Sequence, residues 1–228
     1  GVSDGTRGAA VYSQNVDGVK AKKAVFFDLD AIYLLGSGIT SASPFEVATT
    51  VNSCLRRGEI LQGDSWVHHD GTGYRGENLS VLTGKRTGDW RFIEGGTAKP
   101  TPQTLDLFQL RIPHGINPSS ASYTVIILPG ATPEETGKWD RGKIIVNNEN
   151  CQAVEFFDGM TAAVFHAPGK LDTFETRQPG IFLITENKVT AADPTGKLRE
   201  ITISLNKIEK RIHLPSGAMA GSSVQIPF

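Results

Sequence analysis

The sequence predicts an all-β protein built as an antiparallel sandwich of large sheets. Short apolar or alternating runs rich in Val, Ile, Thr, Phe and Tyr recur along nearly the whole 228-residue chain, and such residues suit a pleated, half-buried surface. The 25 glycines and 12 prolines fall mainly between these runs, where they favour turns. The strands do not alternate with helices, which argues against a parallel sheet.

The expected strands follow one another in runs such as AAVYSQ, KKAVFFDLD, AIYLLGSGI, EVATTVN, TLDLFQLRI, ASYTVIILP, KIIVNN, CQAVEFF, TAAVFHA, IFLITEN, REITISLN and SSVQIPF. One helical turn is expected at TPEETGKW. There Thr132 is the expected N-cap, Pro133 takes the first helical position, and two glutamates favour the positive end of the helix dipole. Gly137 is expected to end this helical turn.

The texture of the chain changes near residue 140, in the segment KWDRGK. Before it the expected strands are long and the loops are rich in glycine; after it the strands become short, closely spaced hairpins. We therefore expect a large antiparallel β-sandwich over residues 1–142 and a smaller C-terminal antiparallel β-sandwich over residues 143–228. No low-complexity linker separates them, so the two parts are expected to pack together.

Charge and hydropathy exclude two classes of partner. The formal net charge of -1 and the pI near 6.6 lack the basic footprint that nucleic-acid binders usually carry. No apolar run approaches the roughly 20 residues that a membrane-spanning helix needs. We expect neither a nucleic-acid nor a membrane partner, and an acidic polymer would have to be held by local basic patches.

The two cysteines, Cys54 and Cys151, carry no sign of reactivity or metal binding. Neither belongs to a CxxC pair or adjoins a histidine, and a chain of this size does not need a disulfide staple. We expect buried, unreactive thiols, with a single bridge between them as the alternative.

The segment SWVHHDGTGY, residues 65–74, gathers the titratable side chains that most resemble a catalytic or metal-binding cluster. Asp-Gly is a strong hairpin signal, so the two histidines are expected on a strand before the turn, pointing to opposite faces. We expect a structural hairpin whose turn is formed by Asp70 to Gly73, with one solvated and one packed histidine. A His/Tyr acid-base pair and a metal site completed by His114 or His166 are the alternatives.

Other stretches offer binding chemistry beside a structural reading. Arg56 and Arg57 in CLRRGEI suit a carboxylate or sulfate, although a solvated sheet edge is the competing interpretation. Three lysines in GVKAKKAVFF fit a charged edge strand, and GSGITS fits a strand end rather than a nucleotide-binding loop. Tryptophans can stack on sugar rings, but at least two of the three are expected in the core. The residues in question are Lys20, Lys22, Lys23, Trp66, Trp90 and Trp139.

Several segments, taken in order, resemble polysaccharide lyase family 8, which includes chondroitin, hyaluronan and xanthan lyases. They are DGTRGAAVYSQNVDGVKAKKAVFFDLDAIYLLGSGI, EVATTVNSCLRRGEI, WVHHDGTGY, FQLRIPHGINPSSASYTVIILPG, NNENCQAVEF, DPTGKLREITISL and AGSSVQIPF. The first of these looks most like the chondroitin sulfate ABC type. The likeness extends over essentially the whole chain. It implies part of the family's β-supersandwich, followed by its small C-terminal β-sandwich.

The resemblance also implies where catalysis resides. Members of the family carry an Asn, His, Tyr and Arg set on an upstream α-helical toroid, with a Glu from the earlier part of the β-region. Nothing in this chain looks like that toroid, and the chain is expected to start after the Glu. We therefore expect no catalytic residue, no metal and no cofactor here, and no activity of this chain alone. The parent enzyme would act by β-elimination at a uronic acid.

Two further function classes compete with this non-catalytic lyase fragment. An autonomous carbohydrate-binding module for acidic polysaccharides would use Arg56 and Arg57 or an aromatic platform. A metal enzyme would use His68, His69 or His114. For the lyase fragment, the expected partners are an acidic glycosaminoglycan and the upstream helical domain. The expected location, implied by the resemblance, is secreted or periplasmic.

Overall fold

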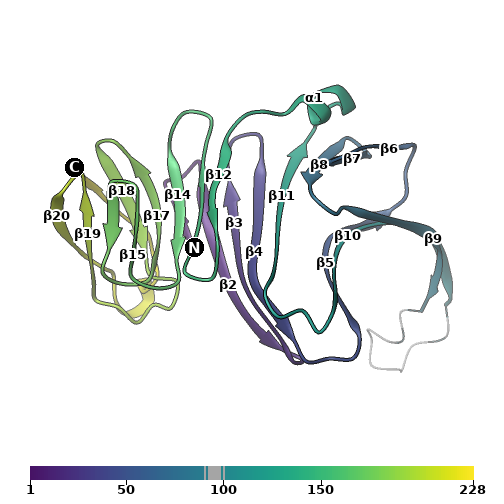
Figure 1. Cartoon of the computed structure of the whole chain (residues 1–228), viewed down its shortest axis with the longest axis horizontal. Coiled ribbons are helices and arrows are strands. Elements are labelled where there is room, and N and C mark those ends of the chain that lie inside the picture. Colours follow the sequence, from purple (N-terminus) through teal and green to yellow (C-terminus); the bar gives the residue numbers. More distant parts are fainter. Residues whose placement is uncertain (90, 92–98, 100) are drawn as a thin grey trace.

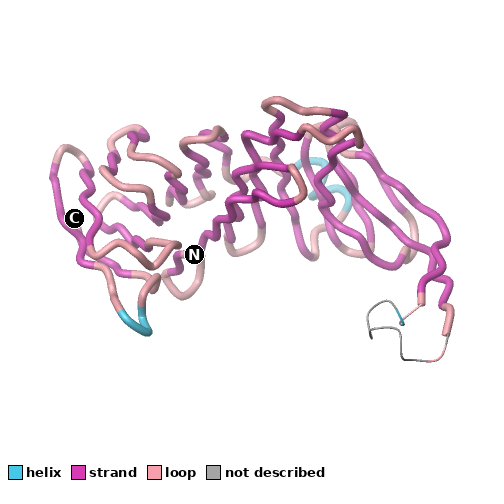
Figure 2. The backbone as a smooth tube through the Cα atoms, turned by 90° about the horizontal axis from the view of Figure 1, so that it is seen from below, coloured by secondary structure: helices cyan, strands magenta, loops and turns pink. Residues whose placement is uncertain are grey.

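The described part of the chain forms four antiparallel sheets and contains very little helix. The structure is a computed structural model that describes residues 1–89, 91, 99 and 101–228. Figure 2 shows that strands make up nearly all of the regular structure, which confirms the all-β prediction. No helix in these residues is long and apolar enough to span a bilayer.

The largest sheet has eight strands in the order β1-β2-β3-β4-β11-β8-β7-β6, and its neighbouring strands pair antiparallel. Its β2 and β3 form a long hairpin, and β11 returns from late in this part of the chain to lie between β4 and β8. The strands are β1 (Val2–Ser3), β2 (Gly8–Val16), β3 (Val19–Phe27), β4 (Ile32–Ser41), β6 (Ile60–Gly63), β7 (Trp66–His69), β8 (Thr72–Gly76) and β11 (Ala121–Pro129).

A three-stranded sheet of order β5-β10-β9 covers one end of the large sheet. It consists of β5 (Glu46–Leu55), β9 (Ser80–Gly88) and β10 (Gln103–Ile116). A compact apolar core forms between the two sheets from Val67, Tyr74, Phe108 and Leu110, each at most 3% exposed. The chain passes from β5 in the small sheet directly to β6 at the rim of the large one, so the intervening residues 56–59 join the two layers.

Two more sheets form the C-terminal part, at the left of Figure 1. The six-stranded sheet contains β12 (Lys143–Asn147), β13 (Cys151–Glu155), β14 (Thr161–Phe165), β17 (Gly180–Thr185), β18 (Lys188–Ala192) and β21 (Val224–Pro227). The four-stranded sheet contains β15 (Gly169–Leu171), β16 (Phe174–Thr176), β19 (Glu200–Leu205) and β20 (Ile208–His213). A single-turn 3-10 helix, η2 (Gly217–Met219), precedes β21. Phe165, Phe174 and Phe182 pack together between these sheets.

The six-stranded sheet also packs against the large N-terminal sheet. One continuous core joins Phe26, Tyr33 and Leu35 from β3 and β4 with Val164 and Leu183 from β14 and β17. The Tyr33 hydroxyl donates a hydrogen bond of 3.0 Å to the carbonyl oxygen of Arg141, just before β12. The expectation that the two parts of the chain pack together is therefore confirmed.

The helical turn forms largely as the sequence predicts. Helix α1 (Pro133–Lys138) has a complete capping box, in which Thr132 Oγ1 accepts from the Glu135 amide and the Glu135 carboxylate accepts from the Thr132 amide. The helix continues past Gly137 to Lys138, so the expected stop was one residue early. An i,i+4 ion pair between Glu134 and Lys138, 2.7 Å long, supports the final turn.

The prediction of a lysine-rich edge strand is wrong. Strand β3 pairs with β2 on one side and β4 on the other, so it lies inside the sheet. Lys22 donates to Ser13 Oγ at 3.2 Å on the neighbouring strand. Burial lowers the pKa of Lys23. The segment GSGITS does form the end of β4, as expected.

Candidate functional site

The histidine-rich segment forms a β-hairpin with a two-residue turn. Strands β7 and β8 pair from Trp66–Arg75 to His69–Thr72, and the turn residues Asp70 and Gly71 both have positive φ, 48° and 71°. These angles are typical of the type I′ turn that Asp-Gly favours. The hairpin prediction is confirmed, although β8 already begins at Thr72.

His68 and His69 point to opposite faces, as alternation requires. His68 Nε2 is 2.8 Å from the carbonyl oxygen of Ala131, to which it donates. His68 is half-buried, so the expectation of one solvated histidine is only partly met. His114 lies apart from both and makes a 2.8 Å hydrogen bond to Thr49. The structure does not bring the three histidines together, and no group of three or more His, Cys, Asp or Glu in the described residues could hold a metal ion.

His69 bridges the two sheets of the small core. It is 1% exposed, and its ring stacks on Phe108 of β10 with centroids 4.1 Å apart. Its Nε2 accepts a 3.0 Å hydrogen bond from the amide of Arg57, which requires that nitrogen to be unprotonated. In the neutral ring the proton is therefore on Nδ1, which faces Cys54 Sγ at 3.9 Å. Burial lowers the pKa of His69 and so favours this neutral form, although the nearby Asp70 carboxylate acts in the opposite direction and raises the pKa.

Tyr74 is buried in the same core and has its own partner. Its hydroxyl accepts a 2.6 Å hydrogen bond from Asn52 Nδ2, and only 3% of the residue is exposed. Burial raises its pKa. Because Tyr74 and His69 are both enclosed and have polar partners inside the protein, a substrate cannot reach them as an acid-base pair in this arrangement.

Arg56 and Arg57 occupy the turn that joins β5 to β6. The Arg56 amide donates a hydrogen bond of 2.9 Å to the Asp106 carbonyl oxygen, and the Arg57 amide donates to His69 Nε2. These two bonds hold the backbone of the turn in place. The guanidinium groups project outward, with side chains 43% and 68% exposed. Each guanidinium makes one long, weak ion pair. Arg56 Nη1 is 3.9 Å from Asp106 Oδ2, and Arg57 Nη1 is 4.0 Å from Asp70 Oδ2.

Both cysteines are free thiols. Cys151 is buried, and burial raises its pKa to about 12. Cys54 is only half-buried, beside His69. The expectation of unreactive buried thiols therefore agrees with the position of Cys151 and only partly with that of Cys54, and the alternative disulfide does not form.

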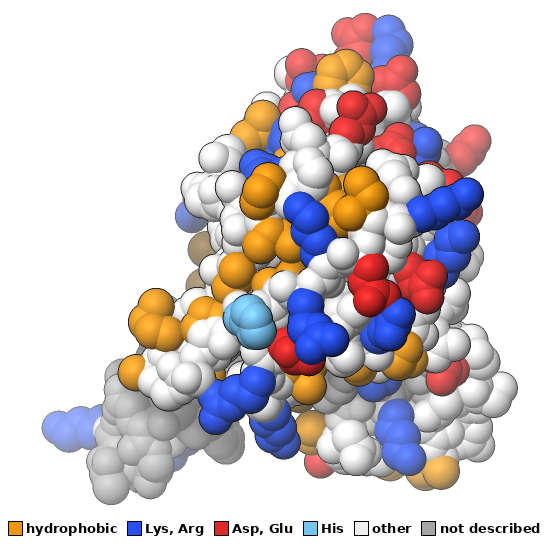
Figure 3. All heavy atoms as spheres, turned by 90° about the vertical axis from the view of Figure 1, so that its left-hand side faces the viewer, with side chains coloured by type: hydrophobic (Ala, Val, Ile, Leu, Met, Phe, Trp, Pro, Cys, Tyr) orange, Lys and Arg blue, Asp and Glu red, His pale blue; other side chains and the backbone are white. Residues whose placement is uncertain are grey.

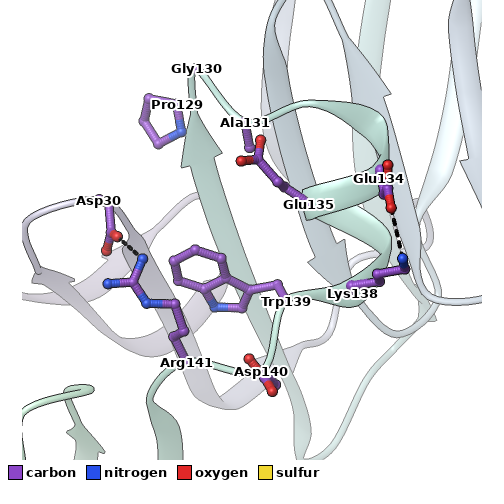
Figure 4. Close-up of a pocket in the computed structure, with 10 residues that line it drawn as sticks. All are labelled: Asp30, Pro129, Gly130, Ala131, Glu134, Glu135, Lys138, Trp139, Asp140 and Arg141. Atoms are coloured by element: carbon purple, nitrogen blue, oxygen red, sulfur yellow. Dashed lines mark hydrogen bonds and ion pairs between the residues drawn. The ribbon is translucent and has the colours of Figure 1, made fainter.

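A second candidate site is a pocket of about 480 Å³ between α1, the end of β11 and the segment leading to β12. Figure 4 shows the Trp139 indole among its side chains, with Arg141 paired to Asp30 beside it. The Arg141 guanidinium is 5.3 Å from the Trp139 ring centroid and 4.9 Å from that of Phe157. Trp139 and Trp66 are half-buried rather than in the core, and Trp90 lies outside the described residues. Sequence reasoning missed Asp30 and Arg141, although WDR combines an aromatic with two charges.

The exposed face at the C-terminal end carries side chains of both charges. In Figure 3, which faces that end of the molecule, basic and acidic side chains are interspersed with apolar ones. On the four-stranded sheet Arg177 pairs with Glu209, and Arg211 lies 3.7 Å from Glu200. An acidic polymer would therefore meet balanced charge on this sheet.

Two family models match the chain. Residues 1–139 match the super-sandwich domain of polysaccharide lyase family 8, and residues 143–202 match the C-terminal beta-sandwich domain of the same family. Together with the four antiparallel sheets, these matches confirm the predicted fold of a large β-sandwich followed by a smaller one.

Curated relatives agree with this assignment. The chain is 33% identical to chondroitinase-AC of Pedobacter heparinus across 99% of its own length and 37% of that protein. It is 31% identical to a xanthan lyase of a Bacillus species, across 75% of the chain and 21% of the relative. A hyaluronate lyase of Thermasporomyces composti is 28% identical across 73% of the chain and 25% of the relative. The chain thus spans little more than a third, or less, of these proteins.

Solved structures show the same fold. A chondroitinase AC lyase studied in complex with oligosaccharides superposes with a TM-score of 0.90 and 31% identity, covering 99% of this chain and 39% of that one. A Paenibacillus xanthan lyase superposes with a TM-score of 0.89, covering all of this chain and 28% of that one, and at 20% identity it supports the fold alone. None of these relatives is of the ABC type, so that finer likeness stays a prediction. The chain belongs to polysaccharide lyase family 8.

Proposed function

We propose that this chain is the non-catalytic β-region of a lyase that cleaves an acidic polysaccharide, serving as a scaffold and as part of one cleft wall. The observation that carries the proposal is the state of His69 and Tyr74. They are the histidine and tyrosine that sequence reasoning considered for acid-base catalysis, yet they are 1% and 3% exposed and hold structural hydrogen bonds. A general acid or base must come within hydrogen-bond reach of the substrate, which neither can do.

The proposed substrate is a glycosaminoglycan of the chondroitin sulfate type. The relatives are named for chondroitin, xanthan and hyaluronate, all of which are acidic polysaccharides, and the one that matches 99% of the chain is a chondroitinase. In the intact enzyme, β-elimination needs three tasks: neutralisation of the uronic carboxylate, removal of the C5 proton and protonation of the leaving glycosidic oxygen. We propose that an upstream α-helical domain supplies these groups.

The proposed cleft-wall contribution of this chain is the turn at Arg56 and Arg57. A guanidinium group recognises carboxylate or sulfate through paired, charge-assisted hydrogen bonds. The present contacts to Asp106 and Asp70, 3.9 Å and 4.0 Å, are longer than such bonds, so exchanging them for a substrate anion sacrifices little. The fixed backbone beneath the turn limits the entropy lost when an anion binds.

The division at residues 142/143 and the secreted or periplasmic location belong to the same proposal. The division is supported by the gap between the two family matches, residues 140–142. The C-terminal part covers Tyr33 and Leu35 of β4 through the shared core, and we propose that it stabilises the larger sandwich in this way.

The cleft-wall role is tested in the full-length enzyme with the paired variant Arg56→Gln/Arg57→Gln. We expect KM for chondroitin sulfate to rise about tenfold, which corresponds to about 1.4 kcal/mol, with kcat changed less than threefold. Arg177→Gln, on the four-stranded sheet, is the matched control and should leave both constants unchanged. An unchanged KM in the paired variant would remove the turn from the cleft wall, and a kcat lost by orders of magnitude would make it part of the chemistry.

The second candidate is an autonomous carbohydrate-binding module for acidic polysaccharides, which the outward projection of Arg56 and Arg57 favours. It predicts saturable binding of chondroitin sulfate or hyaluronan by this chain alone, measured by calorimetry at low salt and weakened in the paired arginine variant. Absence of heat with both polymers would eliminate this candidate and leave the scaffold role intact.

A further inference from the structure

The pocket around Trp139 has the components of a sugar site, and its location differs from that of the arginine turn. Its volume of about 480 Å³ falls within the roughly 300–1,000 Å³ typical of small-ligand sites. It is lined by the end of β11, by α1 and by the segment that leads to β12, together with Asp30 from the turn before β4. Neither the scaffold role nor the proposed cleft wall gives this pocket a function.

The aromatic wall of the pocket is firmly held. Trp139 packs on the core shared by the two parts of the chain. Arg141 lies against the indole and pairs with Asp30, and its carbonyl oxygen accepts the Tyr33 hydroxyl at 3.0 Å. A rigid indole presents a flat, weakly polar surface, which suits the C–H face of a pyranose, and little side-chain entropy is lost when a ligand binds to it.

Carboxylates flank this aromatic wall. Figure 4 shows Glu135 and Asp140 on opposite sides of the Trp139 ring, while Glu134 points to Lys138 on the helix. Only one Glu135 oxygen, Oε2, is taken up by the Thr132 cap, so Oε1 is available as an acceptor. Among the described residues Asp140 has no ion-pair partner. Planar carboxylates accept hydrogen bonds from neighbouring sugar hydroxyls.

The charge of the pocket decides which sugar it accepts. Its lining carries four carboxylates, on Asp30, Glu134, Glu135 and Asp140, against two cations, on Lys138 and Arg141, for a formal charge of -2. Lys138 and Arg141 are each already paired with one of these carboxylates. A uronate or sulfate entering the pocket would therefore meet repulsion without a free cation to offset it.

We propose that the Trp139 pocket is a subsite for an uncharged pyranose unit, which stacks on the indole and hydrogen-bonds to Asp140 and Glu135. In a polymer that alternates charged and uncharged sugars, the pocket would take the uncharged one. The arginine turn favours the charged one, so the two sites differ in the chemistry they select.

The test is an NMR titration of the tryptophan indole N–H signals, with N-acetylglucosamine and glucuronate as probes. Trp139→Phe assigns the relevant signal. We expect N-acetylglucosamine to shift it saturably with a Kd of the order of 1 mM, about -4 kcal/mol, and glucuronate to bind at least tenfold more weakly. Asp140→Asn should weaken N-acetylglucosamine binding at least threefold and should reduce the discrimination against glucuronate.

Asp106→Asn, beside Arg56, is the matched control and should leave the titration unchanged. The proposal is overturned if the Trp139 signal does not move with N-acetylglucosamine, if glucuronate binds as tightly, or if Asp140→Asn binds like the wild type. If Trp139→Phe does not fold, Trp66→Phe and Trp90→Phe assign the Trp139 signal by elimination, because the chain has three tryptophans. The scaffold role and the arginine turn are measured with polymers and with enzyme turnover, so they stand or fall separately.

Discussion

Asn147 and Gln152, on β12 and β13, are joined by a 2.8 Å hydrogen bond in which Gln152 Nε2 donates to Asn147 Oδ1. Asn147 Nδ2 in turn donates to the carbonyl oxygens of Gly36, at 3.1 Å, and Tyr123, at 2.9 Å, in the large sheet. Gln152 Oε1 accepts from His166 at 3.0 Å. This amide relay adds polar contacts between the two parts of the chain to those of their apolar core, and we infer that it helps to hold the two parts in position.

Replacing Asn147 with Ala is expected to lower the free energy of unfolding by about 2–3 kcal/mol, because two carbonyl oxygens and the Gln152 amide lose a buried partner. Urea denaturation measures the change. The exposed Asn15 on β2 is the matched control, and Asn15→Ala should stay within about 0.5 kcal/mol. Equal effects of the two substitutions would show that the relay contributes no stability.

His166 makes stability depend on pH. Burial, with a smaller effect of Lys22, lowers its pKa from 6.5 to about 4. The unfolded chain therefore takes up a proton below about pH 6.5 while the native state does not, so stability is complete above that pH and falls as the pH drops towards 4. Between about pH 7.5 and 4.5 we expect a loss of about 2 kcal/mol that His166→Gln does not show.

The pH measurement compares urea denaturation of the wild type and His166→Gln at both pH values. The pKa values of His69 and His114 are also lowered, but these residues titrate in both proteins and so cancel in the difference. The same pH dependence in wild type and variant would contradict the half-buried, neutral state of His166.

Gly142 is required by a close approach and not only by its backbone angle. Its φ is +72°, and a Cβ there would lie 2.2 Å from the Tyr33 hydroxyl. Gly18 has nearly the same φ, +75°, in the β2–β3 turn, with nothing within 4 Å. We expect Gly18→Ala to cost about 1 kcal/mol and Gly142→Ala at least about 2 kcal/mol more, measured by urea denaturation. Similar costs would indicate that Tyr33 moves aside freely.

His69 is expected to matter for stability far more than for turnover. His69→Ala removes the stack on Phe108 and the acceptor of the Arg57 amide, so it should destabilise the fold by about 2–4 kcal/mol. The exposed His213 on β20 is the control, since His213→Ala should be nearly neutral. In the full-length enzyme at a temperature where the variant is folded, turnover should stay within about tenfold, or 1.4 kcal/mol of barrier. A loss of several orders of magnitude would restore a catalytic role.

Features set by neighbouring residues could be predicted from the sequence. The hairpin at Asp70–Gly71 and the cap of α1 by Thr132 depend on side chains within a few positions of one another. The cap forms as expected, and the hairpin forms with a turn two residues shorter than expected. Positive φ at Asp-Gly and the capping box are local preferences that the rest of the fold does not override here.

Features that depend on strand order could not be predicted in this way. Lys20, Lys22 and Lys23 lie on an inner strand because β2 and β4 flank it, and no local pattern fixes that order. The amide relay joins Asn147 to Gly36, 111 positions away. Its one sequence signal is Gln152, a polar residue within the apolar run CQAVEFF that turns out to be fully buried. The pocket at Trp139 likewise depends on Asp30, which reaches it from the turn before β4.

The most direct test of the scaffold role is an assay of this polypeptide alone for the unsaturated uronic acid that β-elimination produces. Chondroitin sulfate and hyaluronan are the substrates, ultraviolet absorbance follows the product, and circular dichroism confirms that the chain is folded. We predict no product above the no-enzyme control at any pH at which the chain is folded. Steady formation of unsaturated product by this polypeptide would contradict the scaffold role, because the catalytic groups would then reside in this chain.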